Sequence, residues 1–200
     1  EDNNTIIMFA SDNGASAEVV SDESVVSSGR IGTMTRWASL GENWANVSNT
    51  PFRYYKNYSY EGRINTPFIA YWPNQIDPGS HSSFPGHFID LMPTLMDLTG
   101  AKYPENYKEE KIYPYEGRSL LPAFQGQSIE RQKPLFFQWN NGRAVHMDNW
   151  KLVKHGLDTP WKLFDIMKDP TETINLSDEY PSVVHQLDSL HNKWRKRVTH

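Results

Sequence analysis

A short apolar run that ends at a polar turn is the feature that most constrains this sequence. Residues 5–10 are almost all apolar, and such a run has the length of one strand buried on both faces. It ends in Ser-Asp-Asn-Gly at residues 11–14, where the glycine permits a sharp turn. Because open α/β sheets bind ligands beyond the carboxyl ends of parallel strands, the run favours an α/β fold with a binding site at this turn.

Asp12 and Asn13 are the candidate ligands in that turn. A carboxylate and an amide supply hard oxygen donors, which suit Ca²⁺ or Mg²⁺ better than a soft transition metal. Asp-Asn-Gly is also a common sequence of ordinary turns that hold no ligand, so the residues alone leave both interpretations open.

The composition excludes several classes of function. The chain of 200 residues is 38% hydrophobic, enough for one sizeable core or two small ones. Its net charge of −4, without a long run of one sign, argues against a nucleic-acid partner. No stretch approaches the ~20 apolar residues of a membrane span, and the pattern of a signal peptide is missing. The lack of cysteine excludes disulfides, thiol nucleophiles and zinc–thiolate sites.

The start of the chain suggests a piece of a longer protein. The first residue is Glu1 rather than methionine, and a core strand is expected within a few residues of it. A natural amino terminus rarely lies so close to such a strand. We therefore expect a missing amino-terminal half that packs against residues 5–10, and an exposed apolar surface when the chain is alone.

The next segment is expected to be irregular. Residues 15–49 are polar and predict a long loop, in which Trp37 and Trp44 should be anchored. Thr50-Pro51 has the form of a helix start, so residues 52–55 would make one short helical turn.

The middle of the chain predicts a second strand and two helices. Residues 67–72 are apolar and predict another buried strand. Asp90 is expected to cap a helix that stops at Gly100. Residues 103–115 are rich in Pro, Tyr, Lys and Glu and predict a surface excursion, and residues 119–124 fit a short helix.

The last third of the chain changes pattern. Short strand-like runs separated by turn signals predict a small antiparallel sheet, at residues 135–139, 143–147, 150–154 and 161–165. Pro181 then opens a helix with one apolar stripe near the 3.6-residue period. We predict two domains, residues 1–130 as part of an α/β domain and residues 131–200 as a sheet-plus-helix subdomain.

Few residues are placed for chemistry other than the turn. Lys56 lies among several tyrosines, and its ammonium could neutralise charge on a leaving oxygen; the alternative is a surface lysine paired with Glu61. The tyrosines, with Trp37 and Trp44, either stack on a substrate ring or anchor loops. His87 is expected to be a structural hydrogen-bonding residue, and the seven histidines show no metal-ligand spacing. Nucleophile-elbow, Walker and Rossmann patterns are missing.

The order of these segments resembles the carboxyl-terminal half of type I sulfatases, and in places the bacterial arylsulfatases. The resemblance covers almost the whole chain, because the separate motifs follow one another in the family's order. The matching segments are residues 9–14, Lys56, residues 60–62, residues 66–73, residues 90–101, residues 150–153 and residues 161–176, with residues 36–37, 44–46 and 55–56 matching the bacterial arylsulfatases.

The resemblance implies a fold, a reaction and a set of site residues. The fold would be part of an alkaline-phosphatase-like α/β sandwich, followed by the small antiparallel sheet and a carboxyl-terminal helix. Asp12 and Asn13 match residues that complete a Ca²⁺ site, and Lys56 matches the lysine that contacts the sulfate and assists the leaving group. The family's nucleophile is a formylglycine within a Cys/Ser-x-Pro-x-Arg motif in the amino-terminal half. The substrate would be an aryl or sugar sulfate ester, and the full-length protein periplasmic or secreted.

The sequence departs from the family pattern in two places. The nucleophile motif is missing; residues 83–87 contain Ser-x-Pro but no arginine, and they lie in the wrong half. Residues 61–67 read Glu-Gly-Arg-Ile-Asn-Thr-Pro where the family has Glu-Gly-Gly-Ile-Arg-x-Pro. We therefore expect this chain alone to be inactive, with the nucleophile and the remaining Ca²⁺ ligands lying upstream.

Two other classes of function stay open at this point. A phosphomonoester or phosphonate hydrolase of the same superfamily would share the sheet but usually carries a metal cluster with several histidines. A non-catalytic module that binds sulfated glycans would bind glycan through a surface groove, and its binding would not depend on Asp12.

Overall fold

The computed structural model describes residues 2–20 and 29–199. These residues form two compact units. One unit comprises Glu1–Phe9 and Phe68–Gln132, and the other comprises Ala10–Pro67 and Lys133–His200. The two domains predicted from the sequence, residues 1–130 and 131–200, stay a prediction. The two compact units have other bounds, because residues 10–67 group with the carboxyl-terminal sheet.

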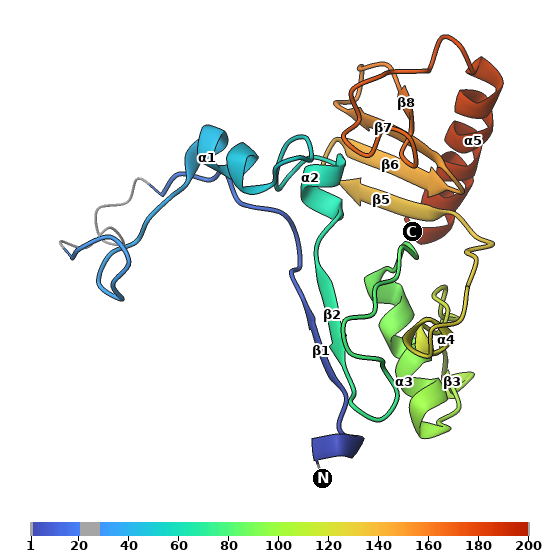
Figure 1. Cartoon of the computed structure of the whole chain (residues 1–200). Helices are drawn as coiled ribbons and strands as arrows, with labels where there is room; N and C mark the ends of the chain where they lie inside the picture. The colour runs from blue at the N-terminus through green and yellow to red at the C-terminus, as the bar shows by residue number, and fades with distance from the viewer. Residues whose placement is uncertain (1, 21–28, 200) are drawn as a thin grey trace. The chain divides into compact units, whose positions relative to one another are not determined.

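A four-stranded antiparallel sheet forms the centre of the second unit (Figure 1). Its strands follow one another in chain order: β5 (Leu135–Trp139), β6 (Gly142–Met147), β7 (Trp150–His155) and β8 (Lys162–Asp165). All four predicted strands are confirmed. Two-residue turns join β5 to β6 and β6 to β7, and Asn140 and Asp148 supply the positive φ angles of 49° and 54° that such turns need.

Both faces of this sheet are covered. Alternate strand residues point to opposite faces. On one face Val145, Leu152 and Leu163 pack against Leu187 of helix α5 (Pro181–Val198), which confirms the predicted final helix. On the other face Ala144, Val153 and Phe164 pack against Tyr60. The sheet therefore holds α5 on one side and the segment that carries Lys56 on the other.

Residues 10–67 differ from the prediction in two places. The expected loop contains helix α1 (Gly41–Ser48), of which only Ala45 is buried. The helical turn expected at residues 52–55 is wrong, because these residues form bends and irregular backbone. The backbone N–H of Tyr54 donates to the side chain of Asn46, and the side chain of Asn49 donates to the carbonyl of Tyr54. These side-chain bonds replace helical ones.

The two tryptophans of the same segment are also not where the sequence predicted. Trp37 is 54% exposed and Trp44 is 66% exposed. The indole N–H of Trp37 donates to Ser39, at 3.3 Å. Both rings are therefore largely exposed, which does not support their role as loop anchors, and stacking on a substrate ring stays a prediction.

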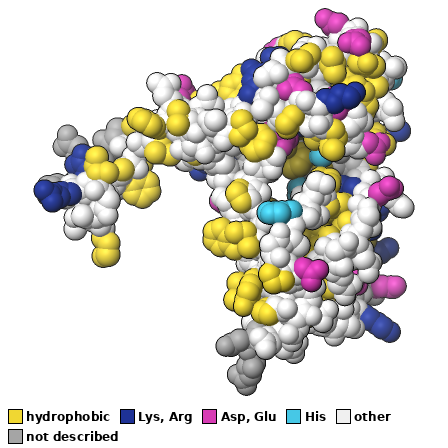
Figure 2. Space-filling view, in the orientation of Figure 1, with side chains coloured by type: hydrophobic (Ala, Val, Ile, Leu, Met, Phe, Trp, Pro, Cys, Tyr) yellow, Lys and Arg dark blue, Asp and Glu magenta, His cyan; other side chains and the backbone are white. Residues whose placement is uncertain are grey.

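The first unit contains the two other predicted strands. β1 (Ile7–Ala10) and β2 (Phe68–Tyr71) pair in a two-stranded sheet, after a 3-10 helix, η1 (Asp2–Asn4). These strands expose apolar surface, as expected for the chain alone, since Ile7 is 56% exposed and Phe9 is 64% exposed. The expectation that a further segment buries them stays a prediction. Figure 2 shows hydrophobic side chains gathered over β1. A sheet of two strands has little of its own to cover its faces, although Phe68 stacks on Phe124.

Short elements complete the first unit. Helix α3 (Leu91–Thr99) follows a 3-10 turn, η2 (Phe88–Asp90), and ends at Gly100, whose φ is 68°. Helix α4 (Leu121–Phe124) is confirmed as well. The surface excursion contains a small hairpin of β3 (Asn106–Tyr107) and β4 (Glu110–Lys111). None of the helices that the structure describes is long and apolar enough to cross a membrane.

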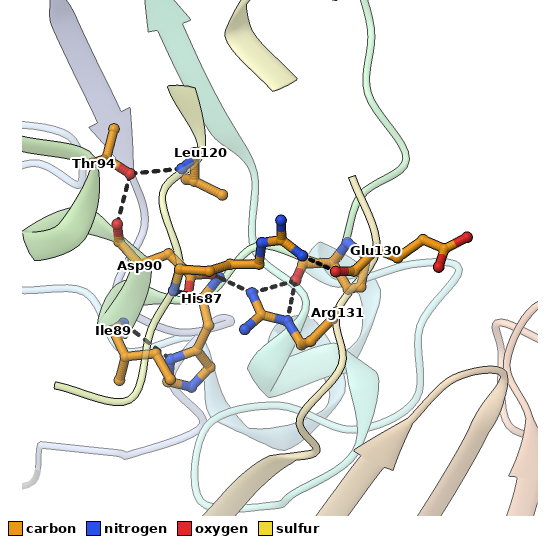
Figure 3. A network of polar contacts seen from close by, with 9 residues as sticks. His87, Ile89, Asp90, Thr94, Leu120, Glu130 and Arg131 are labelled. Carbon is orange, nitrogen blue, oxygen red and sulfur yellow. Dashed lines mark hydrogen bonds and ion pairs between the residues drawn. The ribbon is translucent and has the colours of Figure 1, made fainter. Parts of the chain in front are cut away.

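A polar network centred on Asp90 holds this unit together (Figure 3). The Asp90 carboxylate is fully buried, pairs with Arg131, and accepts hydrogen bonds from the backbone N–H groups of His87 and Arg118 at 2.8 and 2.9 Å. The Thr94 hydroxyl donates to the Asp90 carbonyl at 2.6 Å. The predicted side-chain cap on α3 is wrong, because the carboxylate points back to these groups rather than to the first turn of that helix.

Candidate functional site

The turn after β1 presents two oxygen donors. The Ser11 hydroxyl donates to the carbonyl of Asn13 at 2.8 Å, and the Thr66 hydroxyl donates to the carbonyl of Ser11 at 2.9 Å. The side-chain N–H of Asn13 donates to the carbonyl of Gly14, which leaves its oxygen as an acceptor. Asp12 is exposed, and its carboxylate has no hydrogen bond or ion pair within the described residues. The turn is thus fixed by its neighbours while both candidate ligands stay accessible.

The loop that carries Lys56 lies directly against this turn. The backbone N–H of Lys56 donates to the carbonyl of Ala15 at 3.0 Å. The N–H of Gly14 donates to the carbonyl of Arg63 at 2.9 Å. A Cβ atom at Gly14 would lie 1.8 Å from the carbonyl oxygen of Gly62, so this close approach requires glycine. The structure therefore brings residues 12–15 and residues 56–63, which the sequence analysis selected separately, into one place.

The side chain of Lys56 is paired with an acidic residue that the sequence analysis did not select. Its Nζ atom lies 3.1 Å from Glu18, and one third of the lysine side chain is exposed. Hydrogen bonds from Ser16 and from Lys56 lower the pKa of Glu18. The alternative pairing of Lys56 with Glu61 is wrong, because Glu61 lies buried against Lys151.

The tyrosines around Lys56 contact one another and the sheet. The rings of Tyr54 and Tyr58 stack with centroids 4.4 Å apart, and Tyr58 also lies 4.3 Å from the ring of His155. Tyr60 is buried beside Phe164, and burial raises its pKa to about 12. These contacts fit the interpretation of the tyrosines as anchors of the loop; stacking on a substrate ring stays a prediction.

A buried ionic group, missed by the sequence analysis, joins this loop to the sheet. The Nζ atom of Lys151 lies 2.5 Å from Glu61 and 2.8 Å from Glu172. Lys151 and Glu172 are fully buried, and the backbone N–H of Glu61 donates to Glu172 at 2.8 Å. Burial raises the pKa of Glu172. One signal was present in the sequence, since Lys151 occupies the same face of β7 as Val153.

The turn fits part of a Ca²⁺ site. Ca²⁺ binds 6–8 oxygen ligands, and the carboxylate of Asp12 with the amide oxygen of Asn13 supplies hard donors of the preferred kind. Within the described residues no group of three or more His, Cys, Asp and Glu side chains is arranged to hold a metal. Asp12 and Asn13 therefore suit two positions of a larger ligand set, and their assignment as ligands stays a prediction.

His87 lies in the other unit and has a structural contact. Its Nδ1 atom accepts a hydrogen bond from the backbone N–H of Ile89 at 3.1 Å (Figure 3). Burial lowers its pKa. The prediction that His87 is a structural hydrogen-bonding residue is confirmed.

Known proteins resemble this chain in sequence and in structure. The family model "Sulfatase" matches residues 1–101, and the model "N-sulphoglucosamine sulphohydrolase, C-terminal" matches residues 52–197. An uncharacterized sulfatase of Schizosaccharomyces pombe is 26% identical over 92% of this chain and 36% of its own length. A sulfatase of Formosa agariphila is 31% identical over 68% of this chain and 27% of its own length.

Solved structures show the same arrangement. The crystal structure of Ps i-CgsB in complex with k-i-k-neocarrahexaose matches with a TM-score of 0.71 and 25% identity, over 96% of this chain and 37% of that one. The predicted α/β fold class is thereby confirmed, and the chain spans well under half the length of each of these three proteins. The two family models together extend over residues 1–197, and the chain therefore belongs to the sulfatase family, with its later residues matching the carboxyl-terminal part.

Proposed function

We propose that this chain is the carboxyl-terminal portion of an enzyme that hydrolyses sulfate esters. One observation carries the proposal: the hydrogen bond from Lys56 to Ala15, at 3.0 Å, sets the cationic loop against the turn that presents Asp12 and Asn13. A divalent cation and an ammonium beside one another can share the oxygens of a single sulfate group. Membership of the sulfatase family supports the same reaction.

Each residue has a defined part in this proposal. Asp12 and Asn13 hold Ca²⁺, which when bound offsets negative charge on the sulfate oxygens. When the substrate binds, the ammonium of Lys56 exchanges its ion pair with Glu18 for one with the sulfate group. The ammonium then stabilises the negative charge that develops on the leaving oxygen. A formylglycine nucleophile and the remaining ligands lie upstream of this chain, and the full-length protein is periplasmic or secreted.

The substrate class follows from the family and from one structural relative. The relative was solved in complex with k-i-k-neocarrahexaose, so an enzyme of this architecture accommodates a saccharide. We propose a sugar or aryl sulfate as the substrate.

Substitutions in the intact enzyme test the metal ligands. We expect Asp12→Ala to lower both Ca²⁺ content and sulfate release, and Asn13→Ala to do so less strongly, because a carboxylate carries charge and an amide does not. The control is Asp158→Ala, at an exposed loop residue of the same type. Metal analysis and a sulfate-release assay give the readouts. Unchanged Ca²⁺ content and turnover in Asp12→Ala would refute the assignment.

Lys56→Ala tests the leaving-group role. Removal of a group that stabilises transition-state charge costs about 10²–10³-fold in kcat. The loss should be larger for phenyl sulfate than for 4-nitrophenyl sulfate, because phenolate is the poorer leaving group. A preference for phosphate over sulfate esters would instead indicate a phosphoester hydrolase. Glycan binding that survives Asp12→Ala, without any turnover, would indicate a non-catalytic module.

The chain alone provides a further test. Two side chains on one turn cannot satisfy 6–8 coordination positions, so we expect weak Ca²⁺ binding and no sulfatase turnover. Isothermal calorimetry with Ca²⁺ and a 4-nitrophenyl sulfate assay measure both. Tight binding or turnover by these 200 residues would contradict the proposal.

A further inference from the structure

We propose that Lys151 is a positioning residue for Lys56: the buried group Lys151–Glu61–Glu172 fixes, on the carboxyl-terminal sheet, the loop that presents Lys56 to the sulfate. The inference rests on the proposed function, in which Lys56 contacts the substrate. It extends that function by assigning a catalytic consequence to three buried charges that do not themselves reach the turn at Asp12.

The sheet supplies a rigid base for this group. Lys151 lies on β7, an inner strand, and is paired with His146 of β6 and Phe164 of β8. Its side chain is fully buried and points to the face that also carries Val153, against which Tyr60 packs. A site held by side chains on inner strands is placed more precisely than one held by loops.

The loop is tied to this base at both ends. At its later end, the Glu61 carboxylate pairs with Lys151 at 2.5 Å and its backbone N–H donates to Glu172 at 2.8 Å. At its earlier end, the Arg53 guanidinium donates to the carbonyl of Glu172 at 2.6 Å. The N–H of Gly62 donates to the carbonyl of Arg53 at 2.9 Å and closes the loop. Lys56 lies inside this closed loop.

The loop then sets the position of the turn. Lys56 and Arg63 bond to the backbone of Ala15 and Gly14 respectively, at 3.0 and 2.9 Å. A displacement of the loop on the sheet would therefore move Lys56 and disturb the turn that carries Asp12. The contacts that lead from Lys151 to the backbone of Lys56 all lie within one compact unit.

The charges argue for positioning rather than for stability. Burial of three charged groups incurs a large desolvation penalty, and well-packed apolar residues commonly serve stability as well or better. Two carboxylates lie against one ammonium, which is one negative charge more than an ion pair when both are ionised. Burial raises the pKa of Glu172 and so opposes this excess charge. What the group supplies is a fixed geometry, because the hydrogen bonds from Lys151 to Glu61 and from the Glu61 N–H to Glu172 are directional. Glu172 Oε1 contacts Lys151 as an ion pair without a hydrogen bond.

The test uses Lys151→Met in the intact enzyme, alone and combined with Lys56→Ala. Methionine keeps the length and the apolar stem of lysine but cannot bind the two glutamates. We expect kcat for phenyl sulfate to fall about 10- to 100-fold, since a misplacement of 1 Å costs on that order. The fall should be smaller for 4-nitrophenyl sulfate. Binding of inorganic sulfate, followed by calorimetry, should weaken in parallel.

The double variant provides the decisive comparison. If Lys151 acts through Lys56, the double variant has the same kcat as Lys56→Ala alone. Once the Lys56 side chain has been removed, the loss of its positioning by Lys151 lowers kcat no further. Multiplied losses, or a Lys151→Met loss that is equal for both leaving groups, would overturn the inference. The control is Lys154→Met on the same strand, which lies outside the ionic group and should leave the ratio of the two substrates unchanged.

A milder variant keeps the test decisive if Lys151→Met does not fold. Glu61→Gln keeps the backbone bond to Glu172 but removes one charge, and it should shift the ratio of the two substrates in the same direction. An unchanged ratio in folded Glu61→Gln would overturn the inference. If Lys56→Ala leaves the ratio of kcat for phenyl sulfate to kcat for 4-nitrophenyl sulfate unchanged, the leaving-group role of Lys56 is refuted. If Lys56→Ala shifts this ratio but the Lys151 and Glu61 variants do not, the leaving-group role stands and the positioning by Lys151 is refuted.

Discussion

The sheet of β1 and β2 and the sheet of β5 to β8 differ in how far their apolar side chains are buried. In the carboxyl-terminal sheet, Leu152 and Leu163 are fully buried between α5 and the segment around Tyr60. In the sheet of β1 and β2, Ile7 is 56% exposed and Phe9 is 64% exposed. The strands of both sheets are short and carry apolar side chains. An apolar run therefore predicts a strand, whereas burial depends on which other elements cover it.

The difference follows from where the covering elements lie in the chain. The four carboxyl-terminal strands are joined by short turns, and the helix that covers them follows within the same segment. β1 and β2 are separated by residues 11–67, and a two-stranded sheet has few side chains with which to bury itself. The carboxyl-terminal sheet is thus covered by elements of this chain, whereas β1 keeps apolar side chains exposed.

Truncation of a core residue should have the largest effect of the predictions that address this comparison. Leu163→Ala removes a fully buried side chain of β8 that packs with Leu152 of β7 and Leu187 of α5. We expect a loss of about 2–5 kcal/mol in the free energy of unfolding, from lost transfer energy and the cavity that remains. Urea unfolding of the chain, followed by tryptophan fluorescence, measures it. A loss below about 1 kcal/mol would show that this sheet is no better packed than the other.

A pH effect of intermediate size should be confined to the carboxyl-terminal region. His191 of α5 is fully buried among Phe136, Trp161 and Trp194. Burial, with repulsion from Arg143, lowers its pKa from 6.5 to about 4. Between pH 6.5 and about 4, His191 is therefore protonated in the unfolded chain but not in the folded chain. The free energy of unfolding falls as the pH drops through this range.

The measurement compares His191→Leu with the unchanged chain. Melting temperatures are recorded between pH 7.5 and pH 4.5, and the difference between the two proteins is plotted against pH. The variant should gain relative stability as the pH falls below about 6.5, because it has no proton to bind at this position. A difference that is constant with pH would contradict the assignment. β1 and β2 contain no histidine, so substitutions there should show no such dependence.

The same contrast explains how far the sequence could predict the molecule. Periodicity and turn residues predicted all four strands of the carboxyl-terminal sheet and the helix α5, because these elements are local and locally covered. Helix α1 was missed, since residues 41–48 lack an apolar stripe and only Ala45 is buried. The turn after Thr50 was wrong because side chains of Asn46 and Asn49, distant by several residues, take over the bonds of Tyr54.

The site was predictable only in part. Asp12, Asn13 and Lys56 came from motif order, and the structure adds the backbone contacts that bring them together. The pairing of Lys56 with Glu18 and of Glu61 with Lys151 joins residues 38 and 90 positions apart. No local pattern contains such pairings. The local sign of a buried partner is Lys151, which shares its face of β7 with the buried Val153.

Truncation on the exposed sheet should have the smallest effect, and the effect should depend on what covers the strand. Ile7→Ala in this chain alone removes a side chain that is already half in water, so we expect a change within about 0.5 kcal/mol. Ile174→Ala, at a residue 62% exposed in the other unit, is the matched control. In the intact enzyme the amino-terminal half is expected to cover β1, and the cost of Ile7→Ala should then rise toward the 2–5 kcal/mol of a buried position, while that of Ile174→Ala stays small. Urea unfolding of both variants in both proteins provides the four values. Equal costs for Ile7→Ala in the two proteins would mean that β1 stays uncovered in the proposed full-length protein, and the contrast between the two sheets would then be a property of the fold itself.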